Sequence, residues 1–404
     1  MRLLFLVHGY PPDVVGGHEI RCQRTAEGLR QRGHEVLVLT GYRHRPSVEG
    51  HVWRLLSAYL DNRIELKWML AWKKIYQRNL SIYFDTIDKF KPNVVLIWHS
   101  YRCTNLFVKQ VLSLSEIPVI MFIGGPSALL PDGWERFWSS LGSNVFHRIV
   151  KSILRLIVTL SLPEVSNVFT PNIACFNSYF LRNWALGFPY FHCKQIVVIH
   201  GGVDIKCFTP KSSDNYNYPP NIAYVGRIDP SKNLEILLKA LHKIKSKTNL
   251  GFKGYICGPI SEPKLAIKLK NMVKNMQLSN QVILNFEGLN PSEVPNFLKS
   301  VDIFVYPSIC DWFPNSVLEA MASGCAVITT DVGGQTELIQ NKVNGIIIPT
   351  NNADALSEVL IELITNPSQI VKLGQSAQET IHRYFSFEHY LDKIEKLLWE
   401  VARR

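Results

Sequence analysis

Short apolar runs, each bounded by polar residues or by Gly and Pro, recur along the first half of the chain. The first covers residues 3–7 and ends in His-Gly; HEVLVLT, VVLIW and PVIMFI follow it. Uninterrupted apolar runs of this length are typical of strands that are buried on both faces, and the stretch at residues 20–33 has helical spacing. Strands that alternate with helices predict a parallel, doubly wound sheet.

The same alternation restarts in the second half, with strands expected at residues 196–199 and 222–225 and then at YIC, VILNF, IFVYP, AVITT and GIIIP. A chain of 404 residues is also too long for one ordinary core. We therefore expect an α/β protein with two Rossmann-like, doubly wound parallel-sheet domains at residues 1–195 and 196–380, followed by a helix within 381–404. Because ligands of open α/β sheets bind beyond the carboxyl ends of the strands, functional residues should follow strands and line a cleft between the two sheets.

Composition narrows the class of protein. No apolar run approaches the roughly 18–20 residues of a membrane-spanning helix, and the N-terminal run of five residues is too short for a secretory signal. The eight cysteines are solitary and have no metal-ligand spacing, which is typical of buried, reduced thiols. We expect a cytoplasmic protein, soluble or peripheral to a membrane, with no metal site.

Charge is distributed unevenly. Residues 1–195 hold 23 Lys and Arg against 13 Asp and Glu (+10), and the rest hold 21 against 20 (+1). Residues 67–78 mix Trp68, Trp72 and Tyr76 with cations, and Arg148, Lys151 and Arg155 share one face of a predicted helix. Two readings remain: binding to an anionic membrane surface, at the inner face of the cell membrane, or core-facing apolar stripes with solvated cations. No motif indicates nucleic-acid binding.

Two segments of the second half place charged residues just after strands. AYVGRIDPSKN puts Arg227 at a strand exit and Lys232 at the opening of a helix, an arrangement suited to a diphosphate, although a solvated loop is the simpler reading. In CDWFPNSVLEAMASG, Asp311 precedes a helix predicted at 317–322, and Glu319 lies near its first turn. Glu319 could accept two ribose hydroxyl hydrogen bonds; otherwise Asp311 caps a turn and Glu319 is solvated.

These segments lead to a resemblance. DWFPNSVLEAMASGCAVITTDVGGQTELI resembles the C-terminal signature of retaining glycosyltransferases of family 4, which have the GT-B fold. GYPPDVVGGHE, VIHGGVD, VGRIDPSKN and VNGIIIP match further family segments in the same order, so the resemblance runs nearly end to end. It implies transfer of a sugar from a nucleotide-sugar donor, UDP- or GDP-linked, to a glycan or lipid-linked acceptor, with retention of anomeric configuration, in cell-surface polysaccharide or glycolipid biosynthesis. It implies no cofactor.

The resemblance also assigns roles to residues. Gly16 and Gly17 would let backbone amides approach the diphosphate, Glu319 would hold the ribose, and Asp311 would hold the hydroxyls of the transferred sugar. The implied donor-binding set is Gly16, Gly17, Gly226, Arg227, Lys232, Gly288, Leu289, Asp311, Phe313, Asn315, Ser316, Val317 and Glu319. The implied catalytic set is Asp311, Glu319, Arg227, Lys232 and His99. The final helix would cross back to the first domain.

The chain departs from the family pattern at two positions. Asp311 stands where the family usually has Glu, and Gly124 matches the position of a family histidine that contacts the donor sugar. His99, after VVLIW, is the alternative imidazole, ahead of His18 and His200. No D-x-D triplet occurs, so we expect a metal-independent reaction. Other readings are a GT-B epimerase or phosphorylase, or a non-catalytic nucleotide-sugar binder.

Overall fold

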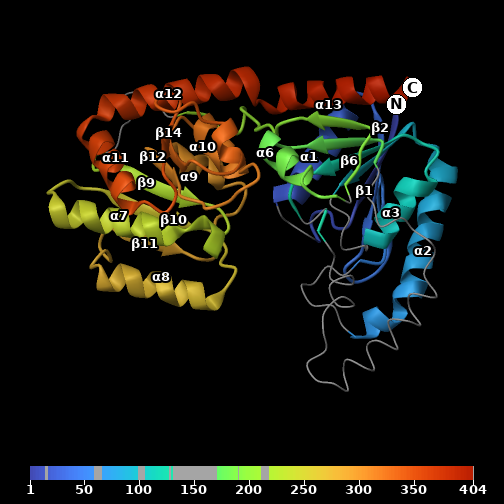
Figure 1. The fold of residues 1–404 in the computed structure, drawn as a ribbon, viewed down its shortest axis with the longest axis horizontal. Helices are drawn as coiled ribbons and strands as arrows, with labels where there is room; N and C mark the ends of the chain where they lie inside the picture. Colours follow the sequence, from blue (N-terminus) through green and yellow to red (C-terminus); the bar gives the residue numbers. More distant parts are fainter. Residues whose placement is uncertain are drawn as a thin grey trace. The chain divides into compact units, whose positions relative to one another are not determined.

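The computed structural model describes residues 1–13, 17–58, 66–98, 105–126, 129–130, 171–189, 191–210 and 218–403. They divide into two compact units. The first comprises Met1–Asn177, Leu181–Ile199 and Leu391–Arg404, and the second comprises Ser178–Phe180 and His200–Tyr390. Each unit is built on its own sheet (Figure 1).

The sheet of the first unit has eight strands within the described residues, in the order β3-β4-β2-β1-β5-β6-β7-β8. All neighbours are parallel except β3, which is antiparallel to β4. The strands are β1 (Arg2–Val7), β2 (Glu35–Gly41), β3 (Ser47–Glu49), β4 (Val52–Leu56), β5 (Val94–Trp98), β6 (Val119–Ile123), β7 (Ile173–Phe176) and β8 (Gln195–Val198). The described helices that begin in this half of the chain are α1 (Gly17–Gln31), α2 (Leu66–Phe90), α3 (Asn105–Leu114) and α6 (Tyr179–Ala185).

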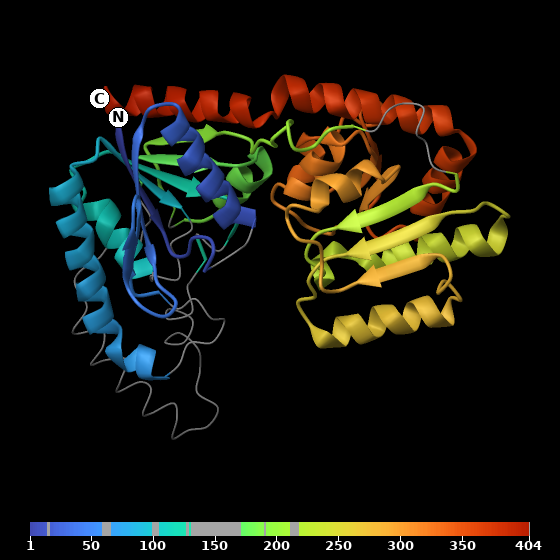
Figure 2. The ribbon, with the colours of Figure 1, turned by 180° about the vertical axis from the view of Figure 1, so that it is seen from behind.

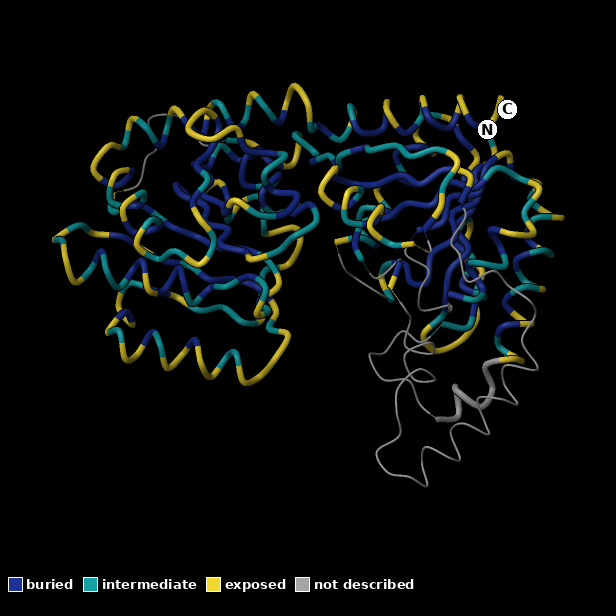
Figure 3. Tube along the Cα trace, in the orientation of Figure 1, coloured by how far each residue is buried: buried dark blue, intermediate teal, exposed yellow. Residues whose placement is uncertain are grey.

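The central strands of this sheet form its core because their apolar runs are covered on both faces. Every residue of β5 and β6 is buried, as is β1 after Arg2. Aromatic side chains stack across these strands: Phe5 lies 6.3 Å from Trp98, and Trp98 lies 4.4 Å from Phe122, between ring centroids. Figure 3 shows these strands as the buried interior.

The sheet of the second unit has six described strands, all parallel, in the order β11-β10-β9-β12-β13-β14 (Figure 2). The strands are β9 (Asn221–Val225), β10 (Lys253–Cys257), β11 (Val282–Asn285), β12 (Ile303–Tyr306), β13 (Ala326–Thr330) and β14 (Ile346–Ile348). The helices are η3 (Pro230–Lys232), α7 (Leu234–Lys247), α8 (Pro263–Asn275), α9 (Val294–Lys299), α10 (Asn315–Ala322), η4 (Gly334–Glu337), α11 (Ala353–Thr365), α12 (Pro367–Tyr384) and α13 (Phe387–Ala402).

The prediction of two doubly wound parallel sheets is confirmed. One strand lies elsewhere than expected: the run at residues 196–199, taken as the first strand of the second series, is β8, and it pairs with β7 at the end of the first sheet. An apolar run indicates a strand but not the strand beside it. In the structure β8 pairs with β7, with Cys175 opposite Val197, and therefore belongs to the first sheet.

The last turns of α13 belong to the first unit through a cluster of ion pairs. A guanidinium nitrogen of Arg32 lies 2.8 Å from Asp392 Oδ1 and 3.0 Å from Glu395 Oε2. His34 Nε2 lies 2.9 Å from Glu395 Oε1. The hydrogen bond from His34, with help from Arg32, lowers the pKa of Glu395 despite partial burial. Residues some 360 positions apart are thus joined.

Two further expectations concern the described residues as a whole. None of their helices is both long and apolar enough to cross a membrane. Of their cysteines, Cys22, Cys175, Cys257 and Cys325 are buried as expected, whereas Cys193 and Cys310 are half-buried and Cys207 is exposed. Its thiol contacts Asp204 in a turn at the surface, which solitary spacing in the sequence could not indicate.

Candidate functional site

The loop after β9 carries the two predicted cations in different environments. Arg227 has a side chain 71% exposed, and its Nε donates to Asp229 Oδ2 at 3.0 Å. Asp229 caps η3 by accepting from Ser231 N at 2.9 Å. Burial raises the pKa of Asp229, but hydrogen bonds from Ser231 and the charges of Lys232 and Arg227 lower it further, so the net pKa is below its usual value. Asp229 therefore remains charged and holds the loop.

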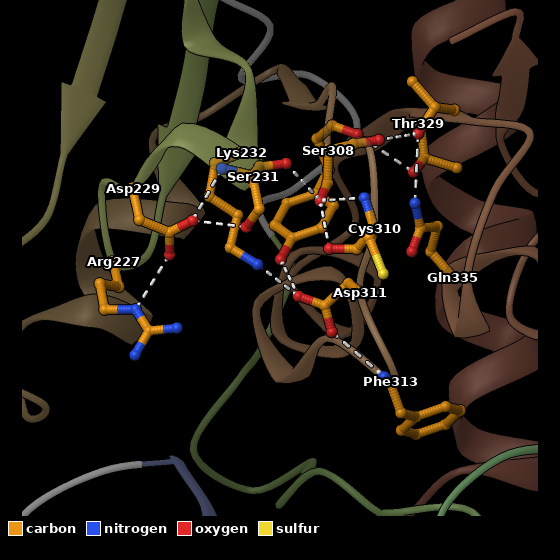
Figure 4. Close-up of polar contacts among 12 residues, drawn as sticks. Arg227, Asp229, Ser231, Lys232, Ser308, Cys310, Asp311, Phe313, Thr329 and Gln335 are labelled. Carbon is orange, nitrogen blue, oxygen red and sulfur yellow. Dashed lines mark hydrogen bonds and ion pairs between the residues drawn. The ribbon is translucent and has the colours of Figure 1, made fainter. Parts of the chain in front are cut away.

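Lys232, the last residue of η3, is only 8% exposed. Its Nζ lies 2.5 Å from Asp311 Oδ2, so the residue expected at the diphosphate and the residue expected at the sugar hydroxyls contact each other directly (Figure 4). Tyr306, at the end of β12, donates its hydroxyl to the same oxygen at 2.6 Å. Phe313 N donates to Asp311 Oδ1 at 3.1 Å.

Two stacked tyrosines, Tyr306 and Tyr224, lie next to the Lys232–Asp311 ion pair. The Tyr306 ring lies 5.4 Å from Lys232 Nζ and stacks on Tyr224 at 5.8 Å. The Tyr224 hydroxyl donates to Arg227 O at 2.7 Å. Burial, and then the charge of Asp311, raises the pKa of Tyr306 well above its usual value. The phenol therefore stays protonated and donates a hydrogen bond to the carboxylate.

The loop after β12 is tied to η3 independently of that ion pair. Ile309 N and Ser308 Oγ both donate to Ser231 O, at 2.8 Å and 2.9 Å. These bonds fix the two strand exits against each other because β9 and β12 are neighbours in the sheet. The phosphate-clamp residues and the acidic loop are therefore one connected structure.

Helix α10 begins at Asn315, two residues before the predicted start, with Pro314 at its N-cap. Asp311 precedes it as expected, but Glu319 is the fifth helical residue and half-buried, beyond the first turn. At the start of the helix Asn315 and Ser316 are half-buried, whereas Phe313 and Val317 are buried. The backbone N–H groups of a first helical turn have no intrahelical partner and favour anions.

The loops that follow the strands of the second sheet, its rim, approach one another closely. Two glycines that no sequence motif indicated make these approaches possible. A Cβ on Gly334 would lie 1.9 Å from Trp312 O, and Gly334 N donates to Asp311 O at 2.8 Å. Gly258, with φ +157°, would place a Cβ 1.7 Å from Gly226 O. The exits of β9 and β10 therefore touch through backbone alone, which the spacing of charged residues in the sequence does not indicate.

The segment expected near the nucleobase is a turn held by one side chain. Asn285, the last residue of β11, accepts from Gly288 N at 3.1 Å and donates to Gly288 O at 3.0 Å. Gly288 has φ +88°, and a Cβ there would lie 3.1 Å from Pro259 Cδ. Leu289 is partly buried against the core. Asn285 was missed because its role depends on the turn geometry.

The strand ends of the first unit place imidazoles beside a glycine. A Cβ on Gly124, directly after β6, would lie 2.4 Å from His18 Nδ1. The His18 ring lies 5.4 Å from Trp98. His8, after β1, and Glu19 are both buried, with Nε2 and Oε1 3.5 Å apart. His18 therefore occupies the space that a side chain at position 124 would take.

Other predicted residues fall into three groups. Gly17 begins α1, whereas Gly16 and His99 lie outside the described residues, as do Arg148, Lys151 and Arg155. Tyr76 is buried in α2, but the side chains of Trp68 and Trp72 are not among those described.

His200 pairs with Glu337 Oε2 at 2.7 Å, and this carboxylate also accepts from Tyr179 N and Phe180 N. His200 is thus part of a packing cluster with Phe313 and Phe385.

No group of three or more His, Cys, Asp or Glu side chains in the part of the chain that the structure describes has the arrangement of a metal site. The described strand exits of the second sheet offer cations, backbone N–H donors and carboxylates that pair with cations.

The chain is similar in sequence to proteins named as glycosyltransferases. Residues 208–380 match the family model of glycosyl transferases group 1. A glycosyltransferase of Methanocaldococcus jannaschii, itself named as uncharacterized, is 24% identical over 96% of this chain and 95% of its own length. The UDP-Gal:alpha-D-GlcNAc-diphosphoundecaprenol alpha-1,3-galactosyltransferase of Escherichia coli is 26% identical over 52% of this chain and 55% of its own length.

Among solved structures, sucrose-phosphate synthase from Thermosynechococcus elongatus superimposes with a TM-score of 0.74. The match has 18% sequence identity and covers 99% of this chain and 98% of the synthase. The segments of this chain that carry Arg227, Lys232, Asp311 and Glu319 lie within the region that the family model covers. The chain has the GT-B fold, and its residues 208–380 match the model of the group 1 glycosyl transferases.

Proposed function

We propose that this protein is a glycosyltransferase that moves a sugar from a nucleotide-sugar donor to a glycan or lipid-linked acceptor. The observation that carries the proposal is the fixed Lys232 ammonium at the joined exits of β9 and β12, inside the region that matches the group 1 model. In α/β sheets, ligands bind beyond such strand ends. A fixed cation at this place suits the diphosphate of a donor.

The proposed reaction requires stabilisation of a leaving nucleoside diphosphate. Arg227 and Lys232 supply positive charge, and the first N–H groups of α10, at Asn315, Ser316 and Val317, supply further donors. Glu319 accepts the ribose hydroxyls, and the backbone at Gly288 and Leu289 frames the base. These assignments follow the family resemblance, and the positions of Arg227 and Lys232 after β9 and of Gly288 after β11 support them.

Retention of configuration and independence from metal belong to the same proposal. With two cations and a helix N-terminus at the leaving group, the charge that forms there needs no divalent ion. The leaving phosphate itself accepts the proton of the acceptor, so the protein contributes positioning and charge stabilisation. Nuclear magnetic resonance of the first product identifies its anomeric configuration; an inverted product contradicts a retaining reaction.

Within the first unit, His18 takes the part that the sequence analysis gave first to His99. Its imidazole fills the space beside Gly124, where the family has a histidine. We therefore assign to His18 the contact with the transferred sugar.

A glycan or lipid-linked acceptor is supported by the name of the E. coli galactosyltransferase, which specifies a diphosphoundecaprenol-linked substrate. Peripheral binding to the inner face of the membrane through the basic first half is part of this proposal. Replacement of Arg148, Lys151 and Arg155 by Glu should release the protein from anionic vesicles; failure of the wild type to sediment with them contradicts membrane binding.

A thermal-shift screen tests the proposed donor. Wild-type protein is heated with UDP-, GDP- and ADP-sugars and with the free diphosphates. Ligand at about 100 times its dissociation constant adds roughly 2.7 kcal/mol to the free energy of unfolding, which is readily measured. A shift with one nucleotide supports the proposal, and the absence of any shift contradicts it.

A product assay then separates the enzyme from its rivals. Release of nucleoside diphosphate that depends on acceptor indicates transfer. A bound donor that never yields diphosphate indicates a non-catalytic binder, and rearrangement of the sugar without acceptor indicates an epimerase.

A further inference from the structure

The Asp311 carboxylate is already bonded at both oxygens by the protein itself. Oδ2 accepts from Lys232 Nζ at 2.5 Å and from the Tyr306 hydroxyl at 2.6 Å, and Oδ1 accepts from Phe313 N at 3.1 Å. In Figure 4 the Lys232 side chain points at this carboxylate, whereas the Arg227 guanidinium points away from it. Three donors from three parts of the unit fix one carboxylate in place.

Lys232 depends on that carboxylate. Its side chain is 10% exposed, so its ammonium has lost most of its contact with water. A buried charge is costly unless an opposite charge and hydrogen bonds compensate it. Asp311 supplies that charge and fixes the direction of one of the three N–H bonds, which leaves two for an anionic ligand.

Tyr306 supports the carboxylate from the buried side. Its ring is 3% exposed and stacks on Tyr224, whose hydroxyl is itself bonded to Arg227 O. The ring also lies 5.4 Å from the ammonium, within reach of a cation–π contact. Tyr306 therefore orients both members of the ion pair, and it does so from a buried position.

We propose that Asp311 is a positioning residue that acts through Lys232, with Tyr306 as its support: its carboxylate holds the ammonium in place and aims it at the donor diphosphate. This inference rests on the proposed function. It differs from the role that the resemblance implies, in which Asp311 holds hydroxyls of the transferred sugar. Substitution of a positioning residue lowers the affinity for every ligand that contains the diphosphate. Substitution of a residue that contacts the sugar lowers the affinity only for ligands that carry the sugar.

Calorimetry of two ligands distinguishes these roles. The probes are the nucleoside diphosphate, UDP or GDP, that the thermal screen selects and its matching nucleotide sugar. Asp311→Asn keeps the shape of the side chain and its acceptor for Phe313 N but removes the charge. We expect it to weaken both ligands by the same factor, about tenfold, which corresponds to about 1.4 kcal/mol. Tyr306→Phe should weaken both by a smaller common factor.

Two variants serve as controls. Asp354→Asn breaks another Lys–Asp pair of the same unit, between the exposed Asp354 and the half-buried Lys243, and should leave both affinities unchanged. Asp311→Glu restores the charge and should recover most of the affinity for the free diphosphate.

Two results overturn the inference. One is a loss of affinity for the nucleotide sugar alone, which places Asp311 on the sugar. The other is tighter binding of the free diphosphate to Asp311→Asn, which makes Asp311 a competitor of the phosphates.

A measurement without nucleotide tests the ion pair separately from the proposed function. Acetic anhydride modifies exposed lysine amines, and mass spectrometry measures the fraction of Lys232 acetylated. Asp311→Asn should increase this fraction while that of Lys243 stays constant. An unchanged fraction contradicts the role of Asp311 even if donor binding is confirmed, whereas a wild type that binds no nucleotide contradicts only the proposed function.

Discussion

The strand ends of the two units carry different chemistry on similar frameworks. Both are the carboxyl ends of parallel sheets, yet in the second unit charged side chains fix one another, as Lys232 and Asp311 do. In the first unit a missing side chain makes room, because His18 packs where a Cβ of residue 124 would lie. A buried charge requires a partner, whereas an uncharged ring requires only space. The two rims therefore respond to substitution in different ways.

The largest effect should follow from loss of the fixed cation. Lys232→Ala removes the ammonium and leaves Asp311 without its countercharge, so kcat/KM for the donor should fall about 100-fold, as when one preorganised donor is deleted from a catalytic site. Lys243→Ala, at the exposed Lys–Asp pair, should have no such effect. Steady-state kinetics of both variants makes the comparison; equal activity would exclude Lys232 from the site.

Backbone contacts offer the next contrast. Gly258 and Gly50 both have positive φ, but a Cβ on Gly258 meets Gly226 O at 1.7 Å, while a Cβ on Gly50 has nothing within 4 Å. Gly258→Ala should lower the free energy of unfolding by about 2 kcal/mol more than Gly50→Ala. Urea denaturation measures both. Similar losses would mean that φ alone, and not the contact of β9 and β10, decides the cost.

The imidazole of the first unit can be moved between positions. His18→Ala should reduce turnover about tenfold, the rate cost of about 1.4 kcal/mol. Gly124→His in that variant should restore part of the turnover, because the Cβ no longer meets the His18 ring. The same change in the wild-type background should instead destabilise the protein. Failure of the double variant to recover activity, when it is folded, argues that position 18 serves packing only.

The smallest expected effect compares one carboxylate from each unit. Glu337 and Glu395 each accept a hydrogen bond from a histidine. Burial raises the pKa of Glu337, but bonds from His200, Tyr179 N and Phe180 N lower it further; for Glu395 the bond from His34 leads the lowering. A lowered pKa gives stability that is complete above the usual value of 4.5 and is lost as the pH falls through the folded-state value.

Substitution by Gln tests that dependence. Glu337→Gln should cost about 1 kcal/mol at pH 7, and Glu395→Gln should cost less because its side chain is 27% exposed against 16%. For both variants, the difference from wild type in the free energy of unfolding should become smaller below pH 4.5. Denaturation at pH 7 and pH 4 measures it, and a gap that stays constant contradicts the assigned bonds.

The sequence predicted both sheets because buried parallel strands leave clear apolar runs. It also placed Arg227, Lys232 and Asp311 after strands, where they are found. It did not predict that Lys232 and Asp311 touch, because they are 79 positions apart and meet only where β9 lies beside β12. Strand order is not encoded in the runs themselves, and the strand at 196–199 was assigned to the wrong series for the same reason.

The position of His18 beside Gly124 was not predicted, for a different reason. Strand-exit position favoured His99, and only the backbone geometry of Gly124 reveals that an imidazole from α1 fills the adjacent space. Tyr306 and Asn285 were missed because both act from strand ends as supports and carry no motif of their own.

The division of the chain has a consequence for its synthesis on the ribosome. The first unit includes Leu391–Arg404, and the second unit occupies most of the chain between Ile199 and that segment. Arg32 and His34 emerge early, but Asp392 and Glu395 are translated only after the second unit. At about 5–20 residues per second, this leaves the first sheet waiting for roughly 10–40 s before its ion-pair cluster can form. The second unit, by contrast, has its sheet complete before the chain is released, so nascent-chain folding should finish in the reverse of sequence order.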